Sequence, residues 1–356
     1  MPRPVEAIID LQALRNNVAV ARRHAGSAQV FAVVKANGYG HGLERILQAL
    51  EAADGYAVVE FDAAVQIRDK AITRPVLLLE GVFDKHELVE ASQQGLATVV
   101  HEHAQVEMLT AARLSRPVDV FIKINTGMNR LGFVPDAVAQ EYAALKRSGN
   151  VAQVVAMTHF ADADGQRGVD WQLTSFEKIA ATLGLQTCAA NSAALLRYPR
   201  SHGAWVRPGI MLYGASPFDD TTADDLGLRP VMTLRSKLIG IQNLARGDSV
   251  GYACTFTADK SMRIGIVAAG YGDGYPRHAP SGSPVLVDGK RCSTVGRVSM
   301  DTLCVDLQAV PQARIGSAVT LWGEGLPVEE VAASAATVSY ELMTRVTARV
   351  PFRTVS

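Results

Sequence analysis

The sequence has little cysteine and no net charge. Its 356 residues include four cysteines, scattered so widely that none forms a C-x-x-C pair or lies beside histidines at metal-ligand spacing. We therefore expect no disulfide scaffold, and a reducing, cytoplasmic setting fits best. The 35 basic residues are balanced by 35 acidic residues, so no basic field favours nucleic acid or an anionic membrane surface as a partner.

Long apolar runs are also missing. No uninterrupted run approaches the roughly 18 residues of a membrane span, and residues 1–6 lack the apolar centre of a signal peptide. Hydrophobic residues nevertheless make up 48% of the chain, enough for one large domain and a smaller one. We therefore expect a protein that acts on a small molecule, without a membrane or nucleic-acid partner.

The first part of the chain alternates between apolar runs and segments of helical pattern. A helix is expected from residue 11, capped by Asp10 and ended by Gly26. Eight strands separated mostly by helices favour an α/β fold with a closed (β/α)8 TIM-like barrel, with a doubly wound sheet as the alternative. The predicted strands cover residues 30–35, 56–60, 76–80, 97–100, 118–125, 154–159, 186–191 and 205–212. The predicted helices include 84–94, 102–114, 136–146 and 170–183.

The pattern changes near Pro230, where short β-branched segments begin. Asp288-Gly289 predicts a hairpin turn between residues 285–287 and 291–295. We assign residues 8–230 to the barrel, and residues 1–7 with 231–356 to a mostly-β C-terminal domain. Its other predicted strands cover residues 232–244, 249–256, 263–268, 283–287, 302–307, 318–322 and 348–353, with helical segments at 328–336 and 340–346.

One lysine stands out at the end of the first predicted barrel strand. Lys35 follows an apolar run and precedes Gly38, Gly40 and Gly42, which predict a turn. At the end of a buried strand, desolvation favours the neutral amine, which is the form that attacks carbonyls to make Schiff bases. The plain alternative is a lysine that marks the exit of the strand into water.

A closed barrel would bring several polar side chains to one rim, because residues just past the carboxyl ends of its strands share that face. These residues are Lys35, Arg130, His159, Asn191, Ser192, Arg207 and Gly209. Lys123 lies inside an apolar run, where a lysine should be ion-paired, neutralised or chemically modified. In the second domain, residues 251–253, 270–275 and 297–301 combine glycine with polar or tyrosine side chains, which favours a site there.

Taken together, these motifs resemble those of the bacterial alanine racemase family. The residues that carry the resemblance are 32–42, 123–132, 158–161, 191–192, 207–210, 251–252 and 299–301, in the expected order over nearly the whole chain. The resemblance implies a pyridoxal 5'-phosphate enzyme that interconverts L-alanine and D-alanine by a two-base mechanism. It also implies a homodimer with shared active sites, in which Lys35 is one base and Tyr252 of the partner chain is the other.

The resemblance also implies a role for each remaining site residue. Arg207 would face the pyridine nitrogen of the cofactor, and Lys123 would be a carbamylated lysine that orients Arg130. The cofactor-binding residues would be Lys35, Tyr39, His159, Asn191, Ser192, Arg207, Gly209, Ile210 and Tyr340. The substrate-binding residues would be Arg130, Met300 and Asp301, and the corridor to the site would be lined by Asp164, Tyr271, Arg277 and Arg297.

Several alternatives remain at this point. Ser299 and Gly165 stand where relatives often have cysteine and histidine, so a broad-specificity amino-acid racemase is the nearest alternative. A decarboxylase on the related scaffold is disfavoured by the lack of a cysteine-centred signature. A non-catalytic pyridoxal-phosphate-binding protein would leave the second domain unexplained, and a metal-dependent hydrolase would need more strand-end ligands than His159. The sequence does not decide between making D-alanine as a peptidoglycan precursor and breaking it down.

Overall fold

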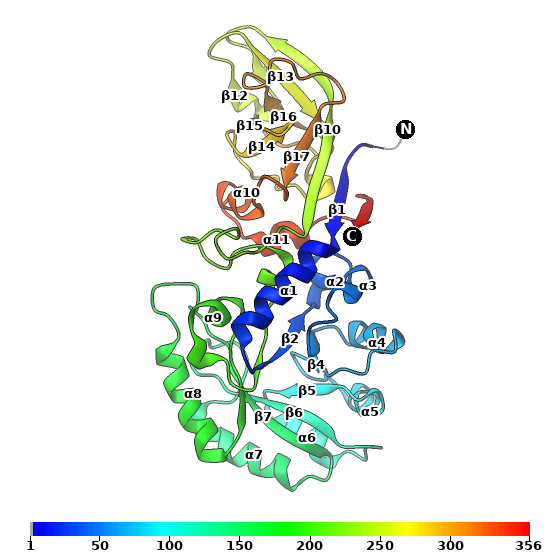
Figure 1. The fold of residues 1–356 in the computed structure, drawn as a ribbon, viewed down its shortest axis with the longest axis vertical. Helices are drawn as coiled ribbons and strands as arrows, with labels where there is room; N and C mark the ends of the chain where they lie inside the picture. Colours follow the sequence, from blue (N-terminus) through cyan, green and yellow to red (C-terminus); the bar gives the residue numbers. More distant parts are fainter. Residues whose placement is uncertain (1–2) are drawn as a thin grey trace.

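Eight parallel strands close into a barrel in the computed structural model, which describes residues 3–356 (Figure 1). Each strand pairs with its neighbour in sequence, and the last pairs with the first. The predicted barrel is confirmed and the doubly wound alternative is excluded. The strands are β2 (Gln29–Val33), β3 (Gly55–Val58), β4 (Val76–Leu78), β5 (Ala97–Val100), β6 (Val118–Lys123), β7 (Val151–Met157), β8 (Gln186–Cys188) and β9 (Trp205–Val206).

Helices surround the barrel. The predicted first helix is confirmed, because the Asp10 side chain accepts a hydrogen bond from the amide of Ala13 at 2.9 Å and Gly26 ends the helix at φ 59°. The barrel helices are α1 (Leu11–Ala25), α2 (Lys35–Tyr39), α3 (Leu43–Ile46), α4 (Phe61–Asp69), α5 (Lys85–Gln94), α6 (His103–Ala111), α7 (Val138–Arg147), α8 (Asp170–Leu183) and α9 (Ser192–Arg197).

The last barrel strand is shorter than predicted. The prediction of strand over 205–212 is wrong beyond Val206, because Pro208 lacks an amide for the strand ladder and the chain turns at Gly209. Residues Ile210–Tyr213 form a 3-10 turn instead. The strand therefore ends early and leaves the backbone around Gly209 free to face the mouth of the barrel.

The second domain is built on a mixed sheet in the order β13-β16-β15-β14-β17-β10-β1-β18. Strand β1 precedes the barrel in sequence but pairs antiparallel with β10 and parallel with β18, so the start and end of the described chain lie side by side. Residues 1 and 2, assigned to this domain from the sequence, lie outside the described residues. The strands are β1 (Glu6–Asp10), β10 (Met232–Leu244), β13 (Met262–Val267), β14 (Pro284–Val287), β15 (Lys290–Val295), β16 (Leu303–Asp306), β17 (Ala318–Trp322) and β18 (Phe352–Val355).

The conformation of two turns explains why one prediction in this domain is confirmed and another is wrong. The predicted hairpin is confirmed, because Asp288 and Gly289 both have positive φ, 47° and 77°, as a tight turn requires. The single strand predicted over 249–256 is wrong. It divides into β11 (Ser249–Val250) and β12 (Phe256–Thr257) around a turn at Tyr252–Cys254, where Ala253 has φ 61°.

Two short helices lie between the barrel and the second sheet, α10 (Val328–Ser334) and α11 (Ser339–Thr344) (Figure 1). Helix α11 packs against α2 so closely that a Cβ atom on Gly40 would lie 2.2 Å from the carbonyl oxygen of Met343. The second domain thus covers part of the barrel mouth with α11.

Candidate active site

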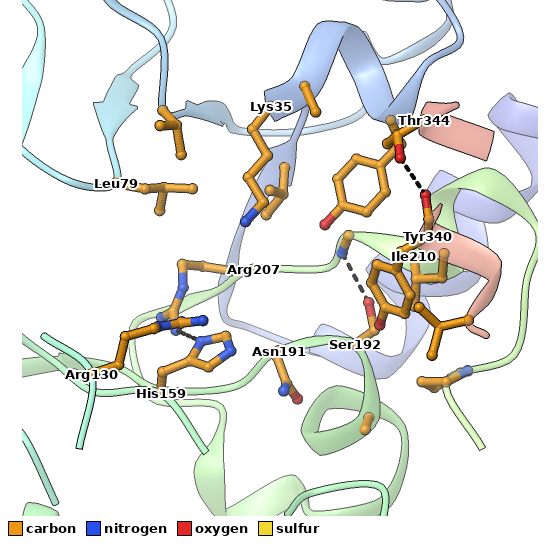
Figure 2. A pocket seen from close by; sticks show the side chains of 18 of the residues that line it. Lys35, Leu79, Arg130, His159, Asn191, Ser192, Arg207, Ile210, Tyr340 and Thr344 are labelled. Carbon is orange, nitrogen blue, oxygen red and sulfur yellow. Dashed lines mark hydrogen bonds between the residues drawn. The ribbon is translucent and has the colours of Figure 1, made fainter. Parts of the chain in front are cut away.

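A cavity of about 650 Å³ lies at the mouth of the barrel, between the strand ends and α11. It brings together most of the barrel residues that the sequence singles out, and Tyr340 of α11 (Figure 2). These residues are Lys35, Tyr39, Lys123, Arg130, His159, Asp164, Asn191, Ser192, Arg207, Gly209, Ile210 and Tyr340. Figure 2 shows Arg130 and His159 on one side of the cavity and Ser192, Ile210 and Tyr340 on the other.

Lys35 begins an unusual left-handed turn. Ala36, Asn37 and Tyr39 have φ between 51° and 54°, a conformation that costs a residue with a Cβ about 1–2 kcal/mol. The Asn37 side chain stabilises the turn by accepting a hydrogen bond from the amide of Leu43 at 2.8 Å. Strain of this kind collects at functional sites, where it holds side chains in one arrangement.

The surroundings of Lys35 favour its neutral amine. Burial lowers the pKa of Lys35, and the positive charge of Arg130 lowers it further, against the opposing charges of Glu80 and Glu60. A lowered pKa increases the fraction of nucleophilic amine at neutral pH. The plain alternative, a lysine in open water, is excluded because Lys35 is partly buried in the cavity wall.

Lys123 is the most buried lysine of the cavity, with 8% of its surface exposed. Burial lowers its pKa to about 8, helped by the positive charges of Arg207 and Arg130. Within residues 3–356, no carboxylate lies within salt-bridge distance of its amine. The ion-pair alternative is therefore wrong for this lysine, and its amine lies in the range where neutral and charged forms coexist at mildly alkaline pH.

Arg207 is fixed by the backbone at the strand ends. Its guanidinium donates to the carbonyl oxygens of Cys188 at 2.7 Å and Thr158 at 2.8 Å. Its Nη2 also lies 3.4 Å from Nδ1 of His159. Burial, followed by the charge of Arg207, holds the pKa of His159 well below its ordinary value, so His159 is neutral and accepts this hydrogen bond. The result is a rigid, permanently charged donor beneath the cavity.

The opposite end of the cavity is rich in neutral donors. Asn191 caps α9 by accepting from the amide of Ala194 at 2.9 Å, which places Ser192 at the cavity. The Ser192 hydroxyl accepts from the amide of Gly209 at 2.8 Å. A Cβ atom on Gly209 would lie 2.4 Å from the Tyr39 hydroxyl, so only glycine leaves room for that hydroxyl.

Two tyrosines complete this end. Burial raises the pKa of Tyr39, and burial followed by the charge of Asp164 raises that of Tyr340 to about 12. Both phenols therefore stay protonated at neutral pH and can donate to an anion. Tyr39 is held by stacking on Tyr213, with ring centroids 4.5 Å apart, and it lies 5.9 Å from the ring of Tyr340. Hydroxyls and amides of this kind fit a phosphate group.

Apart from Tyr340 of α11, the second-domain residues predicted from the sequence do not line this cavity. Tyr252, Tyr271, Arg277, Arg297, Met300 and Asp301 are all exposed and none lines it. Tyr252 is 69% exposed and Met300 is 52% exposed. They form a loop cluster of their own, since the amide of Tyr271 donates to the carbonyl of Ser299 at 3.0 Å and Arg277 lies over the Tyr271 ring. Of the four residues predicted to line the corridor, only Asp164 lies at the cavity of its own chain. Tyr271, Arg277 and Arg297 lie in the loop cluster of the second domain.

Sequence reasoning missed some residues of the cavity wall. Glu80, just past β4, supplies negative charge that opposes the lowered pKa values of both Lys35 and Lys123. The strand-end rule that selected the other rim residues could have found it, but the predicted strand 76–80 included Glu80. Val338 and Thr344 come from the α11 region, whose approach to the barrel was indicated only by the resemblance, through Tyr340.

Two further features concern the described residues as a whole. No group of three or more histidine, cysteine, aspartate or glutamate side chains in residues 3–356 is arranged to hold a metal ion. No helix in that range is both long and apolar enough to cross a membrane.

Comparison with known proteins decides the family. Residues 9–217 match the family model described as the N-terminal domain of alanine racemase, and residues 231–354 match the model of its C-terminal domain. The chain belongs to the alanine racemase family. The resemblance inferred from the motifs is thereby confirmed, and so is the prediction of an amino-acid racemase, an isomerase.

The similarity to alanine racemases extends over the full length of the chain. The chain is 51% identical to alanine racemase of Nitrosomonas eutropha, with 100% of both chains covered, and 51% identical to that of Burkholderia mallei, with 99% of both covered. A crystal structure of biosynthetic alanine racemase from Pseudomonas aeruginosa matches with a TM-score of 0.96 at 46% identity, covering 99% of this chain and 100% of that one. Alanine racemase from Bacillus anthracis with bound L-Ala-P matches with a TM-score of 0.84 at 31% identity, covering 100% of this chain and 96% of that one.

Proposed function

We propose that this protein racemises alanine with pyridoxal 5'-phosphate in the barrel cavity, as a cytoplasmic homodimer with sites shared between chains. One observation carries the proposal. A single cavity holds an amine of lowered pKa, a fixed arginine and a set of protonated donors at the opposite end. Full-length similarity to proteins named alanine racemase supports alanine as the substrate.

The residues of the cavity fit the cofactor. The Lys35 amine suits its aldehyde, and Arg207 suits its ring nitrogen. Its phosphate suits the donor end formed by Tyr39, Ser192, Tyr340 and the backbone at Gly209 and Ile210. When bound, pyridoxal phosphate supplies an electron-withdrawing ring that acidifies the α-hydrogen of an attached amino acid.

Racemisation requires two acid/base groups on opposite faces of the α-carbon. Lys35 serves one face, because its lowered pKa increases the fraction of neutral amine, the form that can accept a proton. The partner's Tyr252 serves the other face. Exposure of Tyr252 outside the cavity of its own chain supports this assignment, since a second chain can approach it there.

Arg207 controls the electronic character of the site. Arginine does not give up its proton, so a ring nitrogen facing it stays unprotonated and withdraws fewer electrons. The hydrogen bonds of Arg207 to the carbonyls of Cys188 and Thr158 keep the guanidinium in place. This setting favours brief proton exchange over side reactions.

Arg130 is proposed to neutralise the substrate carboxylate, with the partner's Met300 and the partner's Asp301 beside it. Lys123 is proposed to be carbamylated. Its buried, unpaired amine has a pKa of about 8, which suits attack on carbon dioxide, and the resulting anion would orient Arg130.

A broad-specificity amino-acid racemase is the second candidate, because Gly165 adjoins Asp164 of the cavity wall and adds no side chain there. Incubation with single L-amino acids, followed by measurement of each D-enantiomer, separates the two. Alanine should turn over fastest by a wide margin. Comparable rates for several amino acids would favour broad specificity, whereas a protein without racemisation of any of them would contradict the proposal.

The cofactor assignment has its own test. Borohydride reduction of the purified holoenzyme should fix pyridoxal phosphate covalently on Lys35, identified by peptide mass. A protein that takes up no pyridoxal phosphate, or that is labelled at another lysine, would exclude Lys35 as the attachment point.

A further inference from the structure

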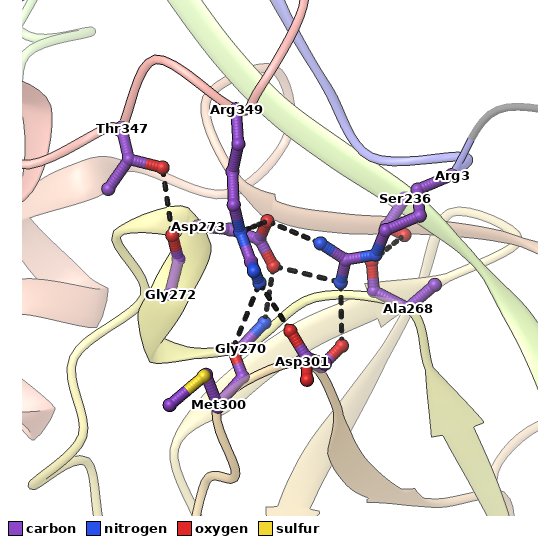
Figure 3. Close-up of polar contacts among 10 residues, drawn as sticks. All are labelled: Arg3, Ser236, Ala268, Gly270, Gly272, Asp273, Met300, Asp301, Thr347 and Arg349. Atoms are coloured by element: carbon purple, nitrogen blue, oxygen red, sulfur yellow. Dashed lines mark hydrogen bonds and ion pairs between the residues drawn. The ribbon is translucent and has the colours of Figure 1, made fainter.

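Asp273 is a buried carboxylate to which the proposed chemistry gives no role. It ends the turn Tyr271–Asp273, which follows β13, and its side chain has 0% exposure. Arg3 donates to it at 2.7 Å, Arg349 donates at 2.8 Å, and the amide of Gly270 donates at 2.9 Å (Figure 3). Two arginines from opposite ends of the chain therefore meet on one carboxylate.

The carboxylate is charged in the folded protein. Burial alone would raise the pKa of Asp273, but the hydrogen bonds from Arg3, Arg349 and the amide of Gly270 outweigh burial and lower it. A buried carboxylate with this many donors is fully satisfied, and removal of its charge would leave two arginines without their shared partner.

The same two arginines reach the neighbouring loop at residues 299–301. Arg3 donates to the carbonyl oxygen of Asp301 at 2.7 Å. Arg349 donates to the Asp301 carboxylate at 2.7 Å and to the carbonyl oxygen of Met300 at 3.2 Å. Figure 3 shows Asp273 between the arginines, with Met300 and Asp301 beside them. Asp273 thus joins its own turn to the loop that carries Met300.

The backbone adds a second set of links. The amide of Gly272 donates to the carbonyl of Met300 at 2.9 Å, and a Cβ atom on Gly270 would lie 2.3 Å from the carbonyl oxygen of Ser299. Thr347 donates from its hydroxyl to the carbonyl of Gly272 at 2.8 Å. The turn, the loop and the segment after α11 therefore form one hydrogen-bonded unit.

We propose that Asp273 is a positioning residue that acts across the dimer: through Arg3 and Arg349, it holds the Tyr271 turn and the Met300 loop in the shape that the partner's cavity requires. The inference rests on the proposed sharing of sites between chains. Its effect falls on the cavity of the partner, because the loop cluster does not line the cavity of its own chain.

Mixed dimers test this directly. In a dimer of a Lys35→Ala chain and a Tyr252→Phe chain, the one live site takes Lys35 from the second chain and Tyr252 from the first. Asp273→Asn placed in the Lys35→Ala chain should lower kcat of that site by about tenfold to a hundredfold, because catalytic geometry tolerates little displacement. The same change placed in the Tyr252→Phe chain should leave kcat nearly unchanged.

Equal losses from both placements would overturn the proposal and show a general structural role. If the mixed dimers without Asp273→Asn are inactive, the sharing of sites is wrong and the proposal falls with it. Arg349→Lys in the same two placements keeps the charge beside Asp273 but loses the second donor to Asp301. Arg349→Lys should lower kcat in the same placement as Asp273→Asn, but by a smaller factor. It provides the test if Asp273→Asn folds poorly.

Glu6→Gln is the matched control. Glu6 also binds two arginines in this domain, Arg235 at 2.7 Å and Arg353 at 3.4 Å, but it joins β1, β10 and β18 and has no hydrogen bond to the 270–274 turn or the 299–301 loop. Its removal should leave kcat unaffected in either placement. Asp273→Asn, Arg349→Lys and Glu6→Gln should also leave the cofactor absorbance of the mixed dimers unchanged, since none of these three residues lines the cavity.

Discussion

The barrel mouth and the loop cluster of the second domain hold their site residues in opposite ways. At the mouth, Arg207 and Ser192 are buried and hydrogen-bonded within one chain. In the loop cluster, Tyr252 and Met300 project into solvent although the backbone beneath Met300 is tightly held. Under the proposed function, one chain supplies the whole cofactor end of the site, and the exposed loop cluster is the surface offered to a second chain.

The largest effects should come from the two proposed bases, one in each region. Lys35→Ala should lose both activity and covalent attachment of the cofactor. Tyr252→Phe should slow racemisation by about 10²- to 10⁴-fold and leave the cofactor bound, because the residues proposed to hold the cofactor all line the cavity of one chain and are unchanged. Racemisation assays and cofactor absorbance measure the two separately. Loss of cofactor from Tyr252→Phe would contradict the division between the two regions, since Tyr252 would then belong to the cofactor end.

Mixing the two inactive variants should restore activity to about a quarter of the wild-type level, because half of randomly assembled dimers contain one live site of two. Each variant mixed with itself is the control. Absence of rescue would place both bases in one chain.

A smaller effect is expected from Gly209→Ala, which perturbs the cofactor end alone. The new Cβ atom would lie 2.4 Å from the Tyr39 hydroxyl and displace it from the proposed phosphate site. The dissociation constant for pyridoxal phosphate should rise by about tenfold, the loss of one good hydrogen bond to an anion. Gly240→Ala is the control, because the nearest atom to its Cβ would be 3.4 Å away, in ordinary contact. Equal affinity in both variants would argue against Tyr39 as a phosphate ligand.

The sequence predicts the mouth of the barrel better than the loop cluster, and the reason is physical. Strand alternation and the shared rim of a closed barrel bring Lys35, His159 and Arg207 together without any knowledge of long-range contacts. No local pattern marks the meeting of Arg3 with Asp273, 270 positions apart. Pairings of that kind are set by the whole fold, so they emerge only from the structure.

Local conformation was also only partly predictable. Three glycines after Lys35 indicate a turn, but they do not show that Ala36 and Asn37 adopt left-handed φ as well. Such strain is imposed by the tertiary structure and runs against the preference of the residues themselves. The same limit explains why the turn at Tyr252 was predicted as part of a strand.

Gly40→Ala should lower the free energy of unfolding more than it lowers the rate of racemisation. Its Cβ would lie 2.2 Å from the carbonyl oxygen of Met343, and its φ of 81° strains any other residue, so we expect a loss of about 2–3 kcal/mol in the free energy of unfolding. Gly184→Ala shares a left-handed backbone, with φ of 64°, but has no neighbour within 4 Å, and it should cost about 1 kcal/mol. Denaturant unfolding measures both. Equal losses of unfolding free energy in both variants would mean that α2 and α11 can move apart at little cost.

A dependence of stability on pH is expected from two buried charges, the unpaired Lys123 of the barrel mouth and the paired Asp273 of the loop cluster. The pKa of Lys123 is lowered to about 8, below its unfolded value, so the unfolded chain binds more protons between about pH 8 and 10. Stability should therefore rise with pH in that window, by up to about 1.4 kcal/mol per pH unit, in buffer free of carbon dioxide. Asp273 has a lowered pKa, so its contribution is present above the unfolded pKa of about 3.9 and is lost as the pH falls through the folded value.

Unfolding of the wild type and of Lys123→Met across pH 7 to 10 isolates the lysine, because methionine keeps much of its length without the charge. The slope should be smaller in Lys123→Met, and Lys35, whose pKa is also lowered, contributes to the slope that remains. The slope should fall by the same amount in wild type saturated with bicarbonate if the Lys123 amine is carbamylated, since a carbamate does not titrate as an amine. A wild-type slope that bicarbonate leaves intact would show that Lys123 stays unmodified. Another anion would then have to orient Arg130, and Glu80 is the glutamate to test first, because it lines the same cavity and its charge acts on Lys123.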